Sequence, residues 1–298
     1  MLAESTLKTE LIKNAVIVNT AINGSLNDFD AKPGDILNFT IAVKNAGKED
    51  ISKAKIQLLI DSPSFKKQSV LGWTDIADKH DGDINGSQIS DSVCRAILMW
   101  DSSKDKDLAL IKSNGQTNLE FQLPIKNSDR APWSSVENYQ IAVTTTLTYT
   151  DKTGATQTIT GNVITVTLNS DLSFKQKNEI SSDNKEHEKH DITWIIGNTF
   201  HALKNVTVDA DLFGDINFSS ASSTPAGTLS FDPATKHLSW NIPDLTENND
   251  VLALPFSVTI NKKNPTQNIL ISKVHLQAQD SVTGKQLEFI GDEVSLNN

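Results

Sequence analysis

The stretch FTIAVKNAGKEDISKAKIQLLID, from Phe39 to Asp61, decides the fold. Apolar and polar residues alternate in FTIAVKN and again in KIQLLID, and the polar segment NAGKED lies between them. Alternation with a period of two predicts strands with one buried face, and Asn, Gly and Asp favour a reversal of the chain. The stretch therefore predicts two β-strands joined by a short turn.

The same order of signals returns in the second half as DITWIIGNTFHALKNVTVDADLFGD, from Asp191 to Asp215. Further landmarks correspond in the same order: Asn45 with Asn198, Trp100 with Trp240, Gly154 with Gly284, and Gly161 with Gly291. An ordered repeat of this kind indicates two copies of one structural unit. We expect a first domain at 1–169 and a second at 170–298.

Strand signals account for almost the whole chain. Turn clusters such as AKPGD, KSNGQ and DKTGA separate the alternating segments, and no long stretch combines helical spacing of apolar residues with helix caps. Connections through crossover helices are therefore not expected. The sequence predicts an all-β protein made of two tandem immunoglobulin-like, Greek-key β-sandwich domains.

Composition excludes several partners and cofactors. The formal net charge of −10 disfavours nucleic acid and anionic membranes as partners. Cys94 is the only cysteine, so no intrachain disulfide and no cysteine-based zinc site can form. It lies in the apolar run VCRAILMW, which favours a small buried residue over a nucleophile. No segment is apolar enough to span a membrane, and MLAESTLKTE lacks the pattern of a signal peptide, so we expect any leader or anchor to be missing from the chain as given.

GDILNFTIAVKNAG, from Gly34 to Gly47, resembles the opening signature of the bacterial surface repeats known as DUF11 and of the related CARDB modules. WDSSKDKD and WNIPDLTEN lie where these immunoglobulin-like repeats carry a tryptophan strand. The second copy has KHD in place of the Gly-Asp pair. The resemblance implies a β-sandwich on a bacterial cell surface, and it brings no catalytic residues.

The first copy is longer than the second at two places, residues 75–91 and 128–138. Insertions in loops often carry function, and Trp73 and Trp133 fall in or beside these two. If the insertions meet, both tryptophans could bind a partner or a sugar ring; the alternative is that they pack over the end of the sandwich. Trp100, Trp194 and Trp240 lie in alternating strands and are predicted core residues.

The first insertion also contains DGDINGSQISD, which resembles the start of a calcium-binding loop. Asp81, Asp83 and Asn85 stand at positions 1, 3 and 5 of such a loop, and Gly86 stands at position 6. The bidentate acid of position 12 is replaced by Ser92, with Asp91 one place early. The candidate ligands of a Ca²⁺ ion are therefore Asp81, Asp83, Asn85 and Asp91, and the alternative is a solvated loop.

The remaining chemistry is sparse. HEKH, His187 to His190, has the residue types of a metal pair, but its charged neighbours favour a solvated turn, and the other histidines are scattered singly. We therefore expect no enzyme. The sequence favours an extracellular, cell-surface structural or adhesive module whose partner is a protein or a glycan. A carbohydrate-binding module and a self-associating subunit of a filament or surface layer are the alternatives.

Overall fold

The computed structural model describes residues 15–183, 187–220, 223–247, 249–262, 264 and 266–296. Over this part of the chain 63% of residues are in strands and 4% in helices, and the strands form several antiparallel sheets, none of them closed. This confirms the predicted all-β class. Within the same residues, no helix is long and apolar enough to cross a membrane.

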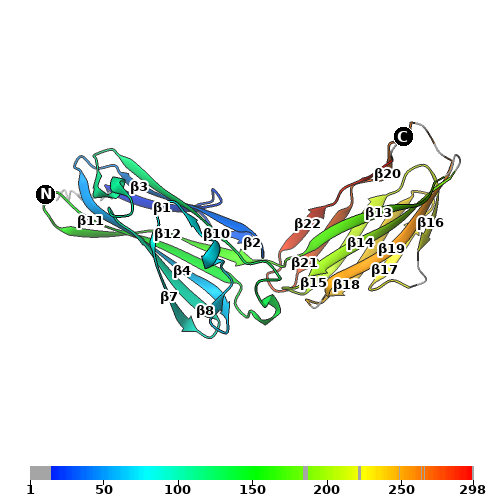
Figure 1. Cartoon of the computed structure of the whole chain (residues 1–298), viewed down its shortest axis with the longest axis horizontal. Coiled ribbons are helices and arrows are strands. Elements are labelled where there is room, and N and C mark those ends of the chain that lie inside the picture. The colour runs from blue at the N-terminus through cyan, green and yellow to red at the C-terminus, as the bar shows by residue number, and fades with distance from the viewer. Residues whose placement is uncertain are drawn as a thin grey trace, which may run out of the picture. The chain divides into compact units, whose positions relative to one another are not determined.

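The chain divides into two compact units (Figure 1). The first unit comprises Met1–Phe29, Ile36–Ile125 and Gln140–Val166, and the second comprises Asp30–Asp35, Lys126–Tyr139 and Thr167–Asn298. Segment Lys126–Tyr139 contains the second of the two insertions, and it packs with the residues that follow it in the chain. We keep 1–169 and 170–298 as a proposal for the domains.

Two sheets face each other in the first unit. One has the strand order β1-β3-β10-β6, and the other has the order β2-β12-β11-β4-β8-β7, with β5 and β9 paired to β4. The strand bounds are β1 Val16–Ile22, β2 Phe29–Ala31, β3 Ile36–Asn45, β4 Ile51–Phe65, β5 Gln68–Ser69, β6 Ala77–Asp78, β7 Asp83–Ser90, β8 Val93–Trp100, β9 Leu110–Ile111, β10 Gln116–Pro124, β11 Gln140–Thr150 and β12 Thr156–Leu168. Three single-turn helices connect them: η1 Trp73–Asp75, η2 Lys106–Ala109 and η3 Trp133–Ser135.

The second unit is built the same way. Its sheets have the orders β13-β14-β19-β16 and β17-β18-β15-β21-β22, and β20 pairs with β23 in a small third sheet. The bounds are β13 Ser173–Asp183, β14 Glu188–Asn198, β15 Leu203–Asp211, β16 Asp215–Ser220, β17 Thr228–Asp232, β18 His237–Leu245, β19 Asn249–Lys262, β20 Ile269–Ile271, β21 His275–Asp280, β22 Gln286–Ile290 and β23 Val294–Ser295.

The two units repeat strand by strand. The order β1-β3-β10-β6 corresponds to β13-β14-β19-β16, and β12-β11-β4-β8-β7 corresponds to β22-β21-β15-β18-β17. The register agrees as well, because Trp100 lies opposite Ile56 of β4 and Trp240 lies opposite Val208 of β15. The repeat read from the sequence therefore extends to the topology of both sheets.

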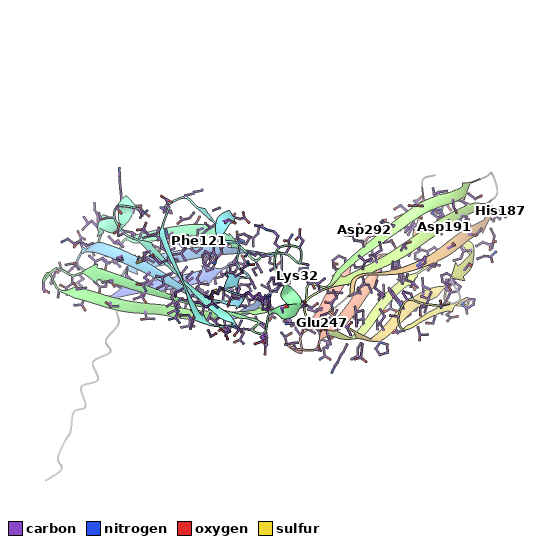
Figure 2. The ribbon with its side chains drawn as sticks, turned by 60° about the horizontal axis from the view of Figure 1, so that its bottom comes forward. Lys32, Phe121, His187, Asp191, Glu247 and Asp292 are labelled. Carbon is purple, nitrogen blue, oxygen red and sulfur yellow. The ribbon has the colours of Figure 1, made fainter. Side chains whose placement is uncertain are left out.

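Alternating side chains fill the space between the sheets. Trp100, Trp194 and Trp240 are 1%, 0% and 0% exposed, which confirms them as core residues. In the first unit, Phe39 stacks on Phe121 with 4.4 Å between ring centroids, and Figure 2 labels Phe121 in that interior. Burial of such large apolar side chains is the main source of stability in a sandwich without disulfides.

Candidate binding site

The first insertion folds as a strand. Residues Asp83–Ser90 form β7 and pair with β8, and β4 is 15 residues long where its counterpart β15 has 9. The polar and glycine-containing sequence DINGSQIS predicts a loop, but the apolar strand β8 supplies a pairing edge that overrides this local preference. The additional residues therefore lengthen one end of the sheet.

A pocket of about 480 Å³ lies on this lengthened part of the sheet. Its walls come from β4, the β4–β5 turn, β5, η1, β7 and β8. The lining residues are Ser62, Lys67, Ser69, Trp73, Ile84, Gly86, Ser87, Gln88, Cys94, Arg95 and Ala96. A pocket with an apolar wall and a few polar groups is typical of a ligand site.

Hydrogen bonds fix the polar side of the pocket. Gln88 accepts a hydrogen bond from the Cys94 thiol at 2.8 Å and donates one to Ser64 Oγ at 2.9 Å. The hydroxyls of Ser62 and Ser69 lie 2.9 Å apart. Cys94 is only half-buried, so its prediction as a buried core residue is wrong, because it lies in the part of β8 that lines the pocket. The pocket is therefore preorganised by its own side chains.

A salt bridge borders the pocket. Arg95 donates from Nε and one Nη to the two carboxylate oxygens of Asp61, at 2.7 Å each. These hydrogen bonds, together with the negative charge of Asp61, raise the pKa of Arg95 above its usual value. A bidentate pair of this geometry holds both side chains in place and leaves little of the charge of Arg95 for a ligand.

The two tryptophans of the insertions have different surroundings. Trp73 is half-buried in η1 and lines the pocket. Trp133 is 2% exposed, packs edge-on against Phe200 with 4.8 Å between centroids, and donates to the carbonyl of Asn127 at 3.1 Å. Trp133 belongs to the second unit and does not line the pocket of Trp73. Trp133 is buried but lines a different pocket, within the second unit, so the predicted binding role of each tryptophan stays a prediction.

The residues of the proposed calcium loop do not form a loop. Asp83 and Asn85 lie on β7, Asp81 lies in the turn before it with φ of 50°, and Asp91 lies in the turn after it. Lys104 is 2.9 Å from Asp83 and 3.9 Å from Asp81, and the hydrogen bond to Asp83 raises the pKa of Lys104. Within the residues that the structure describes, no group of three or more His, Cys, Asp or Glu side chains is placed to hold a metal.

Calcium therefore gives a first testable prediction. Because Asp83 is held in a strand and paired with Lys104, we expect millimolar Ca²⁺ to leave the melting temperature of the chain unchanged relative to EDTA. A ligand that binds only the folded state would add about 2.7 kcal/mol to the free energy of unfolding at a hundredfold excess over Kd, and the melting temperature would rise. Differential scanning fluorimetry measures this, and a clear rise that Asp83→Asn abolishes would contradict the prediction.

The HEKH segment also differs from its expected solvated turn. His187 is exposed, but His190 is 1% exposed and lies 2.7 Å from Glu188 and 2.9 Å from Asn178. The reason is that β14 begins at Glu188, so alternation points Glu188 and His190 inward. Figure 2 labels His187 at this end of β14 and Asp191 on the same strand. The two histidines do not converge on one metal.

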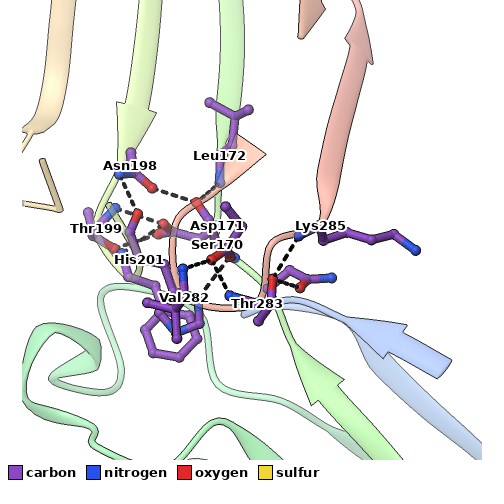
Figure 3. Close-up of polar contacts among 12 residues, drawn as sticks. Ser170, Asp171, Leu172, Asn198, Thr199, His201, Val282, Thr283 and Lys285 are labelled. Carbon is purple, nitrogen blue, oxygen red and sulfur yellow. Dashed lines mark hydrogen bonds and ion pairs between the residues drawn. The ribbon is translucent and has the colours of Figure 1, made fainter. Parts of the chain in front are cut away.

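A second buried cluster holds the opposite end of the second unit together (Figure 3). Asp280 is 0% exposed and accepts hydrogen bonds from the backbone N–H groups of Ser170, Val282 and Thr283. The Nδ1 atom of His201 also contacts this carboxylate, at 2.8 Å from Asp280 Oδ2. Burial raises the pKa of Asp280, but these hydrogen bonds outweigh it, so the pKa lies below its usual value.

The repeated asparagines have the same structural role in both units. Asn45 Nδ2 donates to the carbonyl of Glu49 at 2.8 Å, and Asn198 Nδ2 donates to the carbonyl of His201 at 2.8 Å. Both are buried and both fix the turn that joins the two strands of the opening stretch. Asp151 closes the last hairpin of the first unit, where hydrogen bonds, first of all from Thr153, lower its pKa to about 2. These polar side chains hold turns in place.

Comparison with known proteins gives distant structural likenesses only. No family model matches the chain, and no curated protein matches it. The C-terminal domain of the antigen I/II-family protein AspA of Streptococcus pyogenes aligns over 96% of this chain and 100% of that one, with 9% identity and a TM-score of 0.29. A non-cellulosomal cohesin of the archaeon Archaeoglobus fulgidus aligns over 51% of this chain and 91% of its own, with 14% identity and a TM-score of 0.27.

Red sea bream transglutaminase aligns over 94% of this chain and 31% of its own length, with 8% identity and a TM-score of 0.31. These scores carry no argument about activity. The resemblance to DUF11 and CARDB repeats therefore stays a prediction, and the function has to be argued from the site itself.

Proposed function

We propose that the chain is a non-catalytic module of a cell-surface protein, in which the first unit binds a partner and the second unit spaces and supports it. The observation that carries the proposal is the lengthened end of the β4–β8–β7 sheet with its pocket, because β4 and β7 have 15 and 8 residues where their counterparts β15 and β17 have 9 and 5. Binding residues are found disproportionately in loops and insertions that a scaffold positions.

The buried ionisable groups support a structural role. His201 and Asp280 bond to each other and to backbone groups of loops, and His190 bonds to Glu188 and Asn178 inside the second unit. Catalytic acids and bases need access to a substrate. These groups instead hold the ends of strands together, which favours binding over catalysis.

A binding experiment tests the proposal. The full chain is immobilised on a biosensor and presented with a panel of extracellular proteins and peptides and with an oligosaccharide array. We expect saturable, reversible binding to at least one member and no chemical change in it, measured by mass spectrometry of the recovered ligand. The proposal is wrong if the chain binds no member of the panel, or if mass spectrometry shows that it has chemically changed one.

A carbohydrate-binding module is the second candidate, and the position of Trp73 favours it. The indole lines a pocket beside the hydroxyls of Ser62 and Ser69 and the amide of Gln88, groups that bind sugar hydroxyls. If the ligand is a glycan, Trp73→Ala abolishes retention on the oligosaccharide array while Trp133→Phe, a change in the buried second-unit tryptophan, leaves it intact. Glycan binding that survives Trp73→Ala counts against this candidate.

A further inference from the structure

Strand β7 is an unusually open edge of its sheet. It is the last strand in the order that ends β4-β8-β7, and six consecutive residues, Asp83 to Gln88, pair in regular register with β8. Seven of its eight residues are exposed, among them Ile84 and Ile89 at 43% and 51%. Edge strands are usually protected by lysine, by proline, by a β-bulge or by being short. DINGSQIS contains no lysine or proline, and its one register shift, between Gln88 and Ser90, lies at the end of the strand.

The free side of β7 offers backbone groups for pairing. In the described part of the chain, β8 is the only strand that pairs with β7; at the end of β7, the carbonyl of Ser90 also accepts a hydrogen bond from Gln88 Nε2. A strand added there would lie about 4.8 Å away and would pair with alternate residues of β7. Its alternate side chains would point to the same face as the inward side chains of β7.

The pocket lies on that inward face. Ile84 lies opposite Leu98, Gly86 opposite the buried Ala96, and Gln88 opposite Cys94, so these three residues of β7 lie on the face of the sandwich core. All three line the pocket, and Gly86 adds no side chain to fill it. A side chain of an added strand that points inward would therefore enter the pocket between β7 and Trp73.

In the second unit, two aromatic side chains fill the equivalent place. There β17 has only five residues, and its Phe231 lies opposite Leu238, in register with Ile84 opposite Leu98. Phe231 stacks on Phe218 of β16 with 4.7 Å between centroids and packs against the core. The first unit has no such pair at its pocket, so an occupant from outside would complete it.

Charges near β7 indicate the chemistry of that occupant. Asp81 and Asp83 stand before the middle of the strand and Asp91 stands after it, whereas Lys67 lines the pocket. A neutral, large apolar side chain suits the pocket because Lys67 would repel a cation there. Asp83 is already paired with Lys104, so lysine or arginine on either side of the apolar residue suits Asp91 at one end and Asp81, which Lys104 approaches to 3.9 Å, at the other.

We propose that β7 binds an extended peptide segment of another protein by strand addition, with one apolar side chain in the pocket of Trp73 and basic residues flanking it. The inference rests on the proposed binding function of the first unit and names its partner. Backbone hydrogen bonds along β7 supply general affinity, and the pocket selects one side chain of the peptide.

The decisive variant is Gly86→Leu. A Cβ at Gly86 would meet no atom closer than the Arg95 carbonyl oxygen at 4.0 Å, and the residue has no left-handed backbone, so the variant should fold with an unchanged or higher melting temperature. Its side chain points into the pocket and fills it. Asn85→Leu is the matched control, because the neighbouring residue points to the outer face of the same strand and lies outside the pocket lining.

The probe is a phage-displayed library of roughly 12-residue peptides, long enough to cover β7 with flanking residues. It is selected on the full chain, and the best peptide is synthesised with a fluorophore for anisotropy. We expect alternating sequences with one large apolar residue between basic ones, about tenfold or more weaker binding to Gly86→Leu, and binding to Asn85→Leu within about twofold. The bound peptide should also slow maleimide labelling of Cys94, the only thiol.

Three results would overturn the proposal. One is a selected peptide that binds Gly86→Leu as tightly as the unchanged chain. Another is an oligosaccharide whose binding Gly86→Leu abolishes while no peptide is selected, which makes the pocket a glycan site. The third is concentration-dependent association of the chain, measured by sedimentation and lost in Gly86→Leu, which makes a second copy the occupant. Each of these leaves the proposed binding function intact, and that function fails if the biosensor panel finds no ligand or if the chain converts one chemically.

Discussion

Replacing Trp100 by alanine is expected to cost the first unit about 3 to 5 kcal/mol of unfolding free energy. The indole is 1% exposed, lies 5.5 Å from the ring of Phe121, and donates from Nε1 to Asp78 at 2.8 Å. The substitution leaves a cavity between the sheets and also removes a donor from the Asp78 carboxylate. Urea denaturation followed by circular dichroism measures the loss.

Trp73→Ala is the matched control for this prediction, because it deletes the same side chain from the same unit. Trp73 is half-buried at the pocket and has no place between the two sheets. We expect it to cost about 1 kcal/mol, the usual size for a residue outside a core. If the two variants lost equal stability, Trp100 would not hold the central position that the structure assigns to it.

Replacing Asp280 by asparagine is expected to cost about 3 kcal/mol at pH 7, because a buried carboxylate loses its charge while His201 and three backbone N–H groups remain around it. The effect depends on pH. A carboxyl group whose pKa is lowered by folding stabilises the folded state above its unfolded pKa, and this stability is lost as pH falls through the lower, folded pKa.

The stability gap between Asp280→Asn and the unchanged chain should therefore be widest near neutral pH and should narrow below about pH 4. Urea denaturation at several pH values measures the gap. Asp292→Asn removes an exposed carboxylate from the same unit and is expected to change stability by less than about 0.5 kcal/mol at every pH. A gap for Asp280→Asn that widens on acidification would contradict the assignment of its hydrogen bonds.

The sequence predicts the fold well wherever burial alternates cleanly. The strands around Phe39–Asp61 and Asp191–Asp215, the core positions of Trp100, Trp194 and Trp240, and the repeated asparagines all follow from patterns that depend only on local spacing. Each copy also supports the reading of the other, because corresponding signals recur in the same order. The all-β class needs no information beyond this.

The candidate site is harder to predict because it depends on pairing partners far apart in the chain. Nothing in DINGSQIS predicts a strand, since its Asn and Gly favour turns, and only its pairing with β8 makes it β7. Trp133 carries the same sequence signal as Trp73, yet it packs against Phe200, which lies in a distant part of the sequence. The inward position of His190 depends on β14 beginning at Glu188, and the charged residues around it do not indicate where that strand begins.

The stacked Phe218 and Phe231 have a consequence for how the duplicated scaffold can diversify. In the second unit the two rings occupy the place where the first unit has its pocket, and the apolar surface that they bury stabilises that unit. Under the proposed function, the first unit keeps this place open for a ligand. Because the two copies share one topology, different side chains at this edge can make one copy more stable and allow the other to bind a ligand, while the strand order of both stays the same.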